Sequence, residues 1–487
     1  FAGILSHIND LIFVSLILRV GENYDTIKMV CKERSLSWCP YMLTRKETCD
    51  MKSGEHFDVI IIGAGPGGYT AAFAAAEKGI EVTLIDMAEI GGTCLNRGCI
   101  PTKTLRSSAD AVMLAGRLPE YGVETGPAKI CLDTIRKRKD SVIGILRTGL
   151  EKSCSRLKVR FVSGQAEVLS AKEVLVHTKD GDETVTGDAV IIASGSRVLE
   201  LPGLTFDHQY VLNSDDALSL DRIPARLCIV GGGVIGCELA CIYRAFGSAV
   251  TIVEGQDRVL PMPSVDKDVS TLLNRELRKL KIKVMTGKTL RDLQVSDGVV
   301  HAVAATSPFV DVPAEKRTEE PIEADMVLVT VGRKSTADSL GLEKAGVATD
   351  KRGWITVDQH LMTNVPGIYA IGDILGPSHV MLAHVASMEG LCALDNILGK
   401  ERAMDYSVIP SAIFTSPEIG EVGMSEAQAK ESCQKVVTGT VQMRELGKAH
   451  AMGELPGFFK VIADAESGLL LGLHVAGAHA SDLVAEG

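Results

Sequence analysis

The sequence predicts an α/β fold built around two copies of one strand–turn–helix–strand unit. In the first copy, an apolar strand at 57–62 leads into a glycine-rich turn at 63–68, and the strand after the helix ends at Asp86. In the second copy, an apolar strand leads into a glycine-rich turn at 231–236, and the strand after the helix ends at Glu254. The acid follows the first glycine at the same spacing both times, which indicates two related units.

Each turn has the G-x-G-x-x-G pattern of a dinucleotide-binding unit. The first glycine permits the tight turn, the second lets the backbone approach a pyrophosphate, and the third packs the helix on the strand. The helix N-terminus offers amide donors to the phosphates, and the acid accepts hydrogen bonds from a ribose. The candidate nucleotide contacts are Gly63, Gly65, Gly68 and Asp86 in the first unit, and Gly231, Gly233, Gly236 and Glu254 in the second.

A cysteine pair follows the first unit. Cys94 and Cys99 lie in the run GGTCLNRGCIPTK at 91–103. Two cysteines at this spacing can close a small loop, and a small strained disulfide opens easily. The alternatives are two ordinary buried cysteines or half of a zinc site. Zinc pairs usually have about two to four residues between ligands and need a second pair, which is not evident, so we expect no metal site.

Two nucleotide units with a cysteine pair after the first predict an electron relay between a flavin and a nicotinamide. An acid at Glu254 would repel the 2′-phosphate of NADP, so NAD is favoured. Arg258 would favour NADP, but a single arginine four positions after Glu254 is weak evidence for a site that binds the 2′-phosphate.

Composition narrows the class of protein. The chain has 487 residues, enough for about three domains. Hydrophobic residues make up 46% and charged residues 23%, which is typical of a soluble globular protein. A net charge of −11 without a basic block argues against nucleic acid or a membrane as partner. The 12 irregularly spaced cysteines fit a reducing compartment, so we expect the cytoplasm of a bacterial-type cell ahead of the mitochondrial matrix.

The first 50 residues do not match the rest of the chain. The sequence begins with Phe1, and the apolar run at 11–18 is too short to span a bilayer. No cluster of basic residues precedes that run, as a signal peptide would require. We expect residues 1–50 to be extraneous or disordered and the functional protein to begin at Met51.

The motifs together resemble the pyridine nucleotide-disulfide oxidoreductase family. Besides the run at 91–103 and the two turns, the segments TNVPGIYAIGD at 363–373 and LAHVA at 382–386 are similar to its flavin motifs. The segment at 409–418 resembles the start of the family's dimer-interface domain. The resemblance covers about residues 57–487.

The resemblance implies an α/β fold with two Rossmann-like nucleotide-binding domains, for FAD and NAD, and an α+β dimer-interface domain that is incomplete. The implied FAD-binding domain is split, with one segment at 51–195 and another at 331–402, and the NAD-binding domain (196–330) is inserted between them. An N-terminal segment (1–50) precedes these domains, and the dimerisation domain (403–487) follows them.

The activity implied by the resemblance is oxidation of protein-bound dihydrolipoyl groups to lipoyl groups with reduction of NAD, through FAD and a Cys94–Cys99 redox disulfide. Cys94 is expected to be the interchange thiol and Cys99 the charge-transfer thiolate against the flavin, ionised by nearby positive charge and a helix N-terminus. Lys103 is expected to pair with Glu238. The alternatives are a mercuric or other disulfide reductase of the same family, or a catalytically impaired flavin- and NAD-binding fragment.

The resemblance also implies further cofactor contacts. Asp373 is expected to bind the ribityl chain, and His384 is expected to lie along the flavin ring. The remaining implied contacts are Gly92, Thr93, Lys103, Ser194, Gly195, Ala383 and Gly332.

The family's acid/base histidine lies in a C-terminal His-x-His-Pro-Thr motif. His450, His474 and His479 have no such context, and we expect none of them to be the base; His474 is expected in a strand and His479 at a turn or helix start. We therefore expect a chain truncated at its C-terminus, a homodimer when complete. The expected partners are lipoyl domains of 2-oxo acid dehydrogenase or glycine cleavage complexes.

Overall fold

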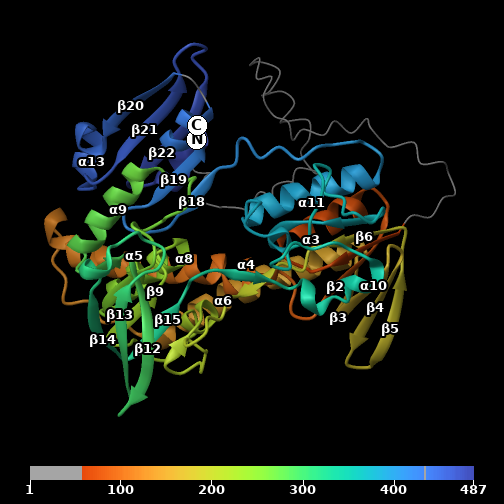
Figure 1. Ribbon diagram of the computed structural model, residues 1–487, viewed down its shortest axis with the longest axis horizontal. Coiled ribbons are helices and arrows are strands. Elements are labelled where there is room, and N and C mark those ends of the chain that lie inside the picture. The colour runs from red at the N-terminus through yellow and green to blue at the C-terminus, as the bar shows by residue number, and fades with distance from the viewer. Residues whose placement is uncertain (1–57, 433–434) are drawn as a thin grey trace. The chain divides into compact units, whose positions relative to one another are not determined.

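The structure, a computed structural model, describes residues 58–432 and 435–487 (Figure 1). The expectations for residues 1–50, for Met51 and for Phe57 lie outside the described residues. The described chain forms two compact units. The first contains the residues up to Gly92 with 148–196 and 335–404, and the second contains 93–147, 197–334 and 405–487.

The first unit is built on a seven-stranded sheet. Strands β17, β6, β1, β2 and β3 are parallel neighbours in that order, and β4 and β5 continue the sheet antiparallel. Strand β6 and residues 59–62 of β1 are apolar and buried because a parallel sheet is covered on both faces. The bounds are β17 (Ile368–Ala370), β6 (Ala189–Ile192), β1 (Asp58–Ile62), β2 (Glu81–Asp86), β3 (Arg160–Ser170), β4 (Glu173–Thr178) and β5 (Gly181–Thr186).

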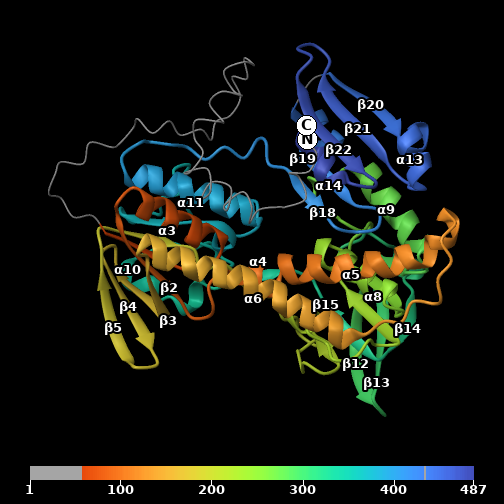
Figure 2. The same ribbon diagram turned by 180° about the vertical axis from the view of Figure 1, so that it is seen from behind.

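Two helices of the first unit pack closely against each other. Figures 1 and 2 show α3 (Pro66–Glu77) and α11 (Ala383–Ile397) side by side. A Cβ at Gly390 would stand only 2.7 Å from the carbonyl oxygen of Gly67, so the absence of a side chain permits this approach. The helix after the first glycine turn is therefore held by a segment more than 300 residues away in sequence, where Ser387 Oγ donates to Pro66 O (3.2 Å).

The second unit contains a second parallel sheet with the order β11, β10, β9, β15, β8. Beside it lies an antiparallel sheet of β12, β13 and β14. Helix α8 (Val234–Ala245) packs against α5 (Cys99–Arg117) (Figure 2). The strands are β11 (Lys283–Thr286), β10 (Ala249–Glu254), β9 (Arg226–Val230), β15 (Met326–Val329), β8 (Val211–Leu212), β12 (Lys288–Ser296), β13 (Val299–Thr306) and β14 (Glu319–Ala324).

The C-terminal portion of the second unit is an antiparallel five-stranded sheet, which we call the C-terminal sheet. Its order is β18 (Ser411–Ile413), β19 (Ile419–Gly423), β22 (Leu470–Ala476), β21 (Phe458–Asp464) and β20 (Val436–Gln442). The remaining strands, β7 (Ser196–Val198) and β16 (Arg333–Ser335), pair with each other. The other α-helices are α4 (Gly92–Arg97), α6 (Leu132–Leu157), α7 (Ser214–Ala217), α9 (Lys267–Lys279), α10 (Leu342–Ala345), α12 (Glu426–Ser432), α13 (Gly447–Met452) and α14 (Ala480–Leu483).

Two sequence-based expectations about histidines are confirmed. His474 lies in β22 and is fully buried, and His479 directly precedes α14 with a φ of +62°. Among the described residues, no helix is both long and apolar enough to cross a membrane. In the same portion of the chain, no group of three or more metal-ligating side chains could hold a metal ion.

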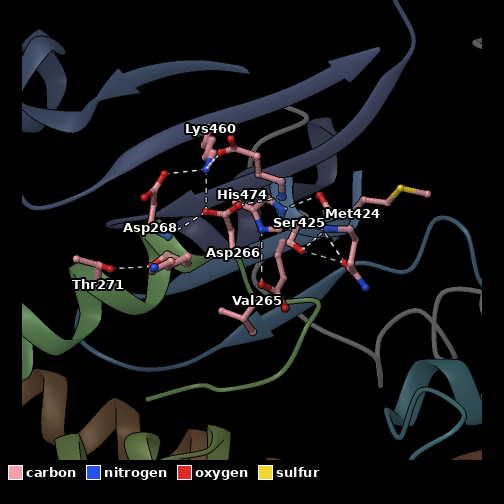
Figure 3. A network of polar contacts seen from close by, with 12 residues as sticks. Val265, Asp266, Asp268, Thr271, Met424, Ser425, Lys460 and His474 are labelled. Atoms are coloured by element: carbon pink, nitrogen blue, oxygen red, sulfur yellow. Dashed lines mark hydrogen bonds and ion pairs between the residues drawn. The ribbon is translucent and has the colours of Figure 1, made fainter. Parts of the chain in front are cut away.

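A buried ion cluster joins the C-terminal sheet to the start of α9 (Figure 3). Lys460 Nζ of β21 contacts Asp266 Oδ1 (2.9 Å), Asp268 Oδ2 (2.7 Å) and Glu426 Oε2 (2.6 Å). Lys460 is 3% exposed and Asp266 is 2% exposed. Asp266 also caps α9, because its Oδ1 accepts from Asp268 N (2.9 Å). We call these four residues the Lys460 cluster.

A second titratable pair lies in the same sheet. His474 Nε2 donates to the Met424 carbonyl oxygen (3.0 Å), and its Nδ1 is 3.7 Å from Glu421 Oε2. Burial raises the pKa of Glu421. Burial opposes protonation of His474, but the facing Glu421 carboxyl and the Met424 carbonyl outweigh it, so the pKa of His474 is raised.

These pKa shifts predict a maximum of stability in mildly acidic solution. Burial opposes the charge on Asp266, but hydrogen bonds from Lys460 and two backbone amides outweigh it and lower the pKa of Asp266. Hydrogen bonds from Lys430 and Lys460 lower the pKa of Glu426. Their contributions are therefore present above the ordinary values of 3.8 and 4.5 and are lost as pH falls below them. His474, raised above 6.5, contributes below that pH and loses its contribution as pH rises through the folded value.

Glu421 acts in the same direction as His474, because its raised pKa makes the folded state less stable once the buried carboxyl ionises. The melting temperature should therefore fall on both sides of the maximum. In a His474→Gln variant the decline at high pH should flatten while the decline at low pH stays. An unchanged profile in this variant would show that His474 does not carry the alkaline limb.

Candidate functional site

The first glycine-rich turn has the geometry that its sequence predicts. Gly63 has a φ of +106°, and a Cβ there would stand 2.2 Å from the Ala193 carbonyl oxygen. A Cβ at Gly68 would stand 1.8 Å from the Gly63 carbonyl oxygen, so the helix packs directly on the turn. Gly65 caps α3 without a side-chain hydrogen bond, which leaves the first amides of the helix uncapped by side chains.

The second turn repeats this geometry. Gly231 also has a φ of +106°, and a Cβ at Gly236 would stand 2.0 Å from the Gly231 carbonyl oxygen. Gly233 caps α8, again without a side-chain hydrogen bond, and a Cβ there would meet nothing within 4 Å. The second turn therefore presents backbone amides beside space that no described side chain fills.

The two acids at the strand ends hold their own turns. Asp86 Oδ2 accepts from Ala64 N (2.6 Å), and Glu254 Oε2 accepts from Gly232 N (2.6 Å). Glu254 is only 7% exposed, and its Oε1 accepts from Gln256 N (2.7 Å). The acids thus shape the glycine turns, which the sequence pattern alone does not indicate.

Arg258 is engaged by the backbone. Its NH1 donates to Val265 O (3.1 Å) and its NH2 donates to Met262 O (3.0 Å). Because these bonds direct the guanidinium to main-chain carbonyls, the residue that argued for NADP has another structural role. The charged group that contacts the second turn is therefore the Glu254 carboxylate, whose negative charge is the one expected to disfavour a 2′-phosphate.

Substitutions at Gly236 and Gly233 are expected to affect different properties, namely stability for Gly236 and NADH binding for Gly233. Gly236→Ala should destabilise the protein by about 2–3 kcal/mol, because its Cβ collides with the turn. Gly233→Ala should fold normally, since Gly233 has a φ of −75° and open space around the Cβ position. It should nevertheless bind NADH at least about tenfold more weakly, because the methyl group occupies the space for the pyrophosphate. Urea unfolding and NADH titration measure the two effects; undiminished NADH binding by Gly233→Ala would rule out this turn as the NAD site.

The expected flavin motifs meet within the first unit. Asp373 Oδ2 accepts from Ser196 Oγ (2.7 Å), which brings the motif at 363–373 next to the segment that contains Ser194 and Gly195. Thr336 Oγ1 donates to Ser194 Oγ (3.0 Å) or to the Gly195 carbonyl oxygen (3.0 Å). Ser196 and Thr336 were missed by sequence reasoning, because single hydroxyls outside a motif carry no signal.

The other expected flavin contacts lie at helix and loop ends. Ala383 and His384 are the first residues of α11, and Gly92 is the first residue of α4 with a φ of +58°. A Cβ at Gly92 would stand 2.6 Å from Gly65 Cα, so the absence of a side chain at Gly92 permits its close approach to the first glycine turn. Positions Gly195 and Gly332 have positive φ and open Cβ space. Uncapped helix starts and unfilled glycine positions fit the phosphates and riboses of FAD and NAD.

The cysteines lie within one short helix and at the start of the next. Cys94 lies in α4, Gly98 caps α5 without a side-chain hydrogen bond, and Cys99 is the first residue of α5. Both cysteines are half-buried. Thr102 Oγ1 donates to the Gly98 carbonyl oxygen (2.6 Å), which fixes the connection. A sulfur at the start of a long helix is in the position where the helix dipole stabilises a thiolate.

Lys103 and Glu238 are brought together as expected. Lys103 Nζ is 3.8 Å from Glu238 Oε1, which also accepts from Phe414 N (2.8 Å). The Lys103 ammonium lies 4.2 Å from the centre of the Phe414 ring, a cation–π contact. Glu238 is 4% exposed, so its charge is compensated from two sides. Phe414 was missed as a site residue, although the segment at 409–418 had been singled out.

Comparison with known proteins identifies the family. Residues 57–390 match the family described as pyridine nucleotide-disulphide oxidoreductase, and residues 409–487 match the dimerisation domain of that family. The chain therefore belongs to the pyridine nucleotide-disulphide oxidoreductase family, a class of flavoprotein disulfide oxidoreductases. This confirms the predicted fold class and the FAD and NAD cofactors, and the dimerisation domain indicates a homodimer.

Curated relatives match over most of the chain. A dihydrolipoyl dehydrogenase of Haloferax volcanii is 39% identical, with 88% of each chain covered. A dihydrolipoyl dehydrogenase of Bacillus subtilis is 38% identical, also with 88% of each chain covered. Among solved structures, LpdA from Mycobacterium tuberculosis has a TM-score of 0.80 at 26% identity, covering 88% of this chain and 92% of that one. The flavoprotein disulfide reductase RclA from Escherichia coli has a TM-score of 0.75 at 27% identity, with the same coverage.

Proposed function

We propose that the protein is a dihydrolipoyl dehydrogenase, which oxidises protein-bound dihydrolipoyl groups and reduces NAD. The observation that carries this proposal is the cysteine motif, with Cys99 at the start of α5 and Lys103 one turn later against Glu238. Relatives with this printed name, 38–39% identical over 88% of the chain, support it.

The proposed chemistry is thiol–disulfide interchange. One substrate thiolate attacks Cys94 of the Cys94–Cys99 disulfide, the S–S bond breaks, and Cys99 leaves as a thiolate stabilised by the start of α5. The second substrate thiolate then attacks the substrate sulfur bound to Cys94, which releases the lipoyl disulfide and the Cys94 thiolate; this thiolate takes up one of the two protons that the substrate dithiol gave up. The substrate thus loses two electrons and two protons. When bound, FAD would supply the acceptor for the electron pair of the two thiols, and NAD would supply the carrier that removes it as hydride.

The remaining site residues have supporting roles in this proposal. Lys103, Glu238 and Phe414 keep a compensated charge one turn from Cys99. The residues proposed to hold FAD are Asp86, Asp373, Ser194, Gly195, Gly63, Gly65, Gly68, Gly92, Thr93, Ala383 and His384. Gly231, Gly233, Gly236, Glu254 and Gly332 are proposed to hold NAD.

None of the three C-terminal histidines is proposed as the acid/base. His474 is buried against Glu421, and His450 Nε2 donates to the Arg444 carbonyl oxygen (2.7 Å). His479 lies 3.9 Å from Asp482 at the start of α14. The base and the expected C-terminal truncation stay predictions.

The wider setting is also proposed. The partners are lipoyl domains of 2-oxo acid dehydrogenase or glycine cleavage complexes, and the location is the cytoplasm of a bacterial-type cell. The functional division follows the expected segments 51–195, 196–330, 331–402 and 403–487.

Substrate choice tests the proposal. With the flavin-loaded protein, NADH should reduce lipoamide faster than glutathione disulfide or Hg²⁺, and NADPH should be a poor donor. NADH should also make two further cysteines reactive to iodoacetamide, located at Cys94 and Cys99 by mass spectrometry. Faster turnover of glutathione disulfide or Hg²⁺ would assign another reductase of the family, and NADH binding without any newly reactive cysteines would indicate a binding role.

A further inference from the structure

Arg147 contacts the short segment that separates the two cysteines. Its Nε and NH2 both donate to Asn96 Oδ1, at 3.2 and 3.0 Å. Asn96 comes two residues after Cys94 and three before Cys99, so it lies in the middle of the loop that a disulfide would close. We call this two-bond contact the Arg147 brace.

The Arg147 brace is a partly buried contact with a defined geometry. Both partners are half-buried, and one edge of the guanidinium converges on a single amide oxygen. Arg147 belongs to α6, a 26-residue helix that begins 29 positions after the cysteine motif ends at Lys103 (132 − 103). A rigid helix therefore anchors the loop, which restricts the loop geometry more than contacts within the motif alone would.

The brace also fixes a positive charge at the middle of the segment between the two cysteines. The chain from Asn96 to either cysteine spans at most about 7–11 Å, so the charge bonded to the Asn96 side chain acts on the sulfurs across the motif itself. An arginine stays charged throughout the pH range of the enzyme. Two further cations belong to the same motif: Lys103 is paired with Glu238, and Arg97 acts on the carboxyl group of Asp215, which also feels Arg333.

We propose that Arg147 is a positioning residue that tunes the Cys94–Cys99 pair toward its reduced form. Reduction converts a neutral disulfide into thiols with thiolate character, and a nearby cation stabilises only that product. The brace thereby makes the disulfide easier to reduce. This inference rests on the disulfide chemistry of the proposed function.

The test is a thiol–disulfide equilibrium measured on the flavin-loaded protein. The protein is equilibrated with mixtures of reduced and oxidised dithiothreitol, quenched with acid, alkylated and analysed by mass spectrometry at Cys94 and Cys99. In each exchange, dithiothreitol gives two electrons and two protons to the protein disulfide and closes its own ring. The ratio of dithiol to disulfide reports the equilibrium directly and does not depend on turnover.

Arg147→Gln should shift this equilibrium about three- to tenfold toward the disulfide, because the charge is lost. Arg147→Lys, which keeps the charge but not the two converging bonds, should shift it less. Lys137→Gln is the matched control, since it removes one positive charge from an exposed position of the same helix, and it should leave the equilibrium unchanged.

The outcomes separate the inference from the proposed function. An unmodified protein that never forms the Cys94–Cys99 disulfide would overturn the proposed function and the inference with it. If the unmodified protein forms the disulfide but Arg147→Gln has the same equilibrium, or Lys137→Gln shifts it equally, only the inference is wrong.

Discussion

Replacing Cys94 or Cys99 with serine is expected to reduce lipoamide turnover by at least about a thousandfold, because interchange requires two sulfurs that can form a disulfide. A serine hydroxyl cannot replace either one. Electron entry from NADH uses other residues, so NADH-dependent reduction of a small dye should continue in both variants. The measurement is a parallel assay of lipoamide turnover and dye reduction on flavin-loaded protein.

Cys131 provides the matched control for these substitutions. It is an exposed cysteine immediately before α6, outside the motif at 91–103. Cys131→Ser should retain full lipoamide turnover. If Cys94→Ser or Cys99→Ser also retained it, the pair would not be the redox centre and the proposed mechanism would have to be abandoned.

Lys460→Met is expected to destabilise the protein by about 3–5 kcal/mol, because it leaves the buried Asp266 carboxylate without its cation. Asp266 is 2% exposed and cannot regain water without moving the start of α9. Methionine preserves most of the volume of the side chain, so the loss measures charge compensation rather than a cavity. Urea-induced unfolding with a probe of the C-terminal sheet gives the free energy.

The matched control for Lys460 lies in the same sheet region. Lys435 makes an exposed ion pair with Glu466 (2.9 Å), and Lys435→Met should change the free energy of unfolding by about 0–1 kcal/mol. Equal effects of the two substitutions would show that burial of the Lys460 cluster does not matter. Adding Asp266→Asn to Lys460→Met should recover some of the loss, because one of the uncompensated charges is then removed.

Short stretches of sequence were sufficient to predict the features of the site that depend on residues close together in the chain. The two glycine turns, their acids and the helix start at Cys99 follow from backbone sterics within about thirty residues of chain. The Lys103–Glu238 contact was expected through the family resemblance, since the two residues come from different segments. Their catalytic roles stay predictions.

Other contacts were out of reach for sequence reasoning. The Ser196–Asp373 hydrogen bond and the place of Phe414 against Lys103 depend on how distant segments meet. An isolated serine or phenylalanine has no periodicity or spacing that would reveal its partner.

The sequence by itself thus determined two nucleotide-binding units and a cysteine pair, because these features are written in short, regular spacings. Only the tertiary structure decided that Arg147 contacts Asn96, 51 positions away, and that Lys460 contacts Asp266, 194 positions away. The physical reason is that the residues next to a charged side chain in the sequence do not determine whether that side chain is solvated or buried. Its partner is chosen by the packing of whole helices and sheets.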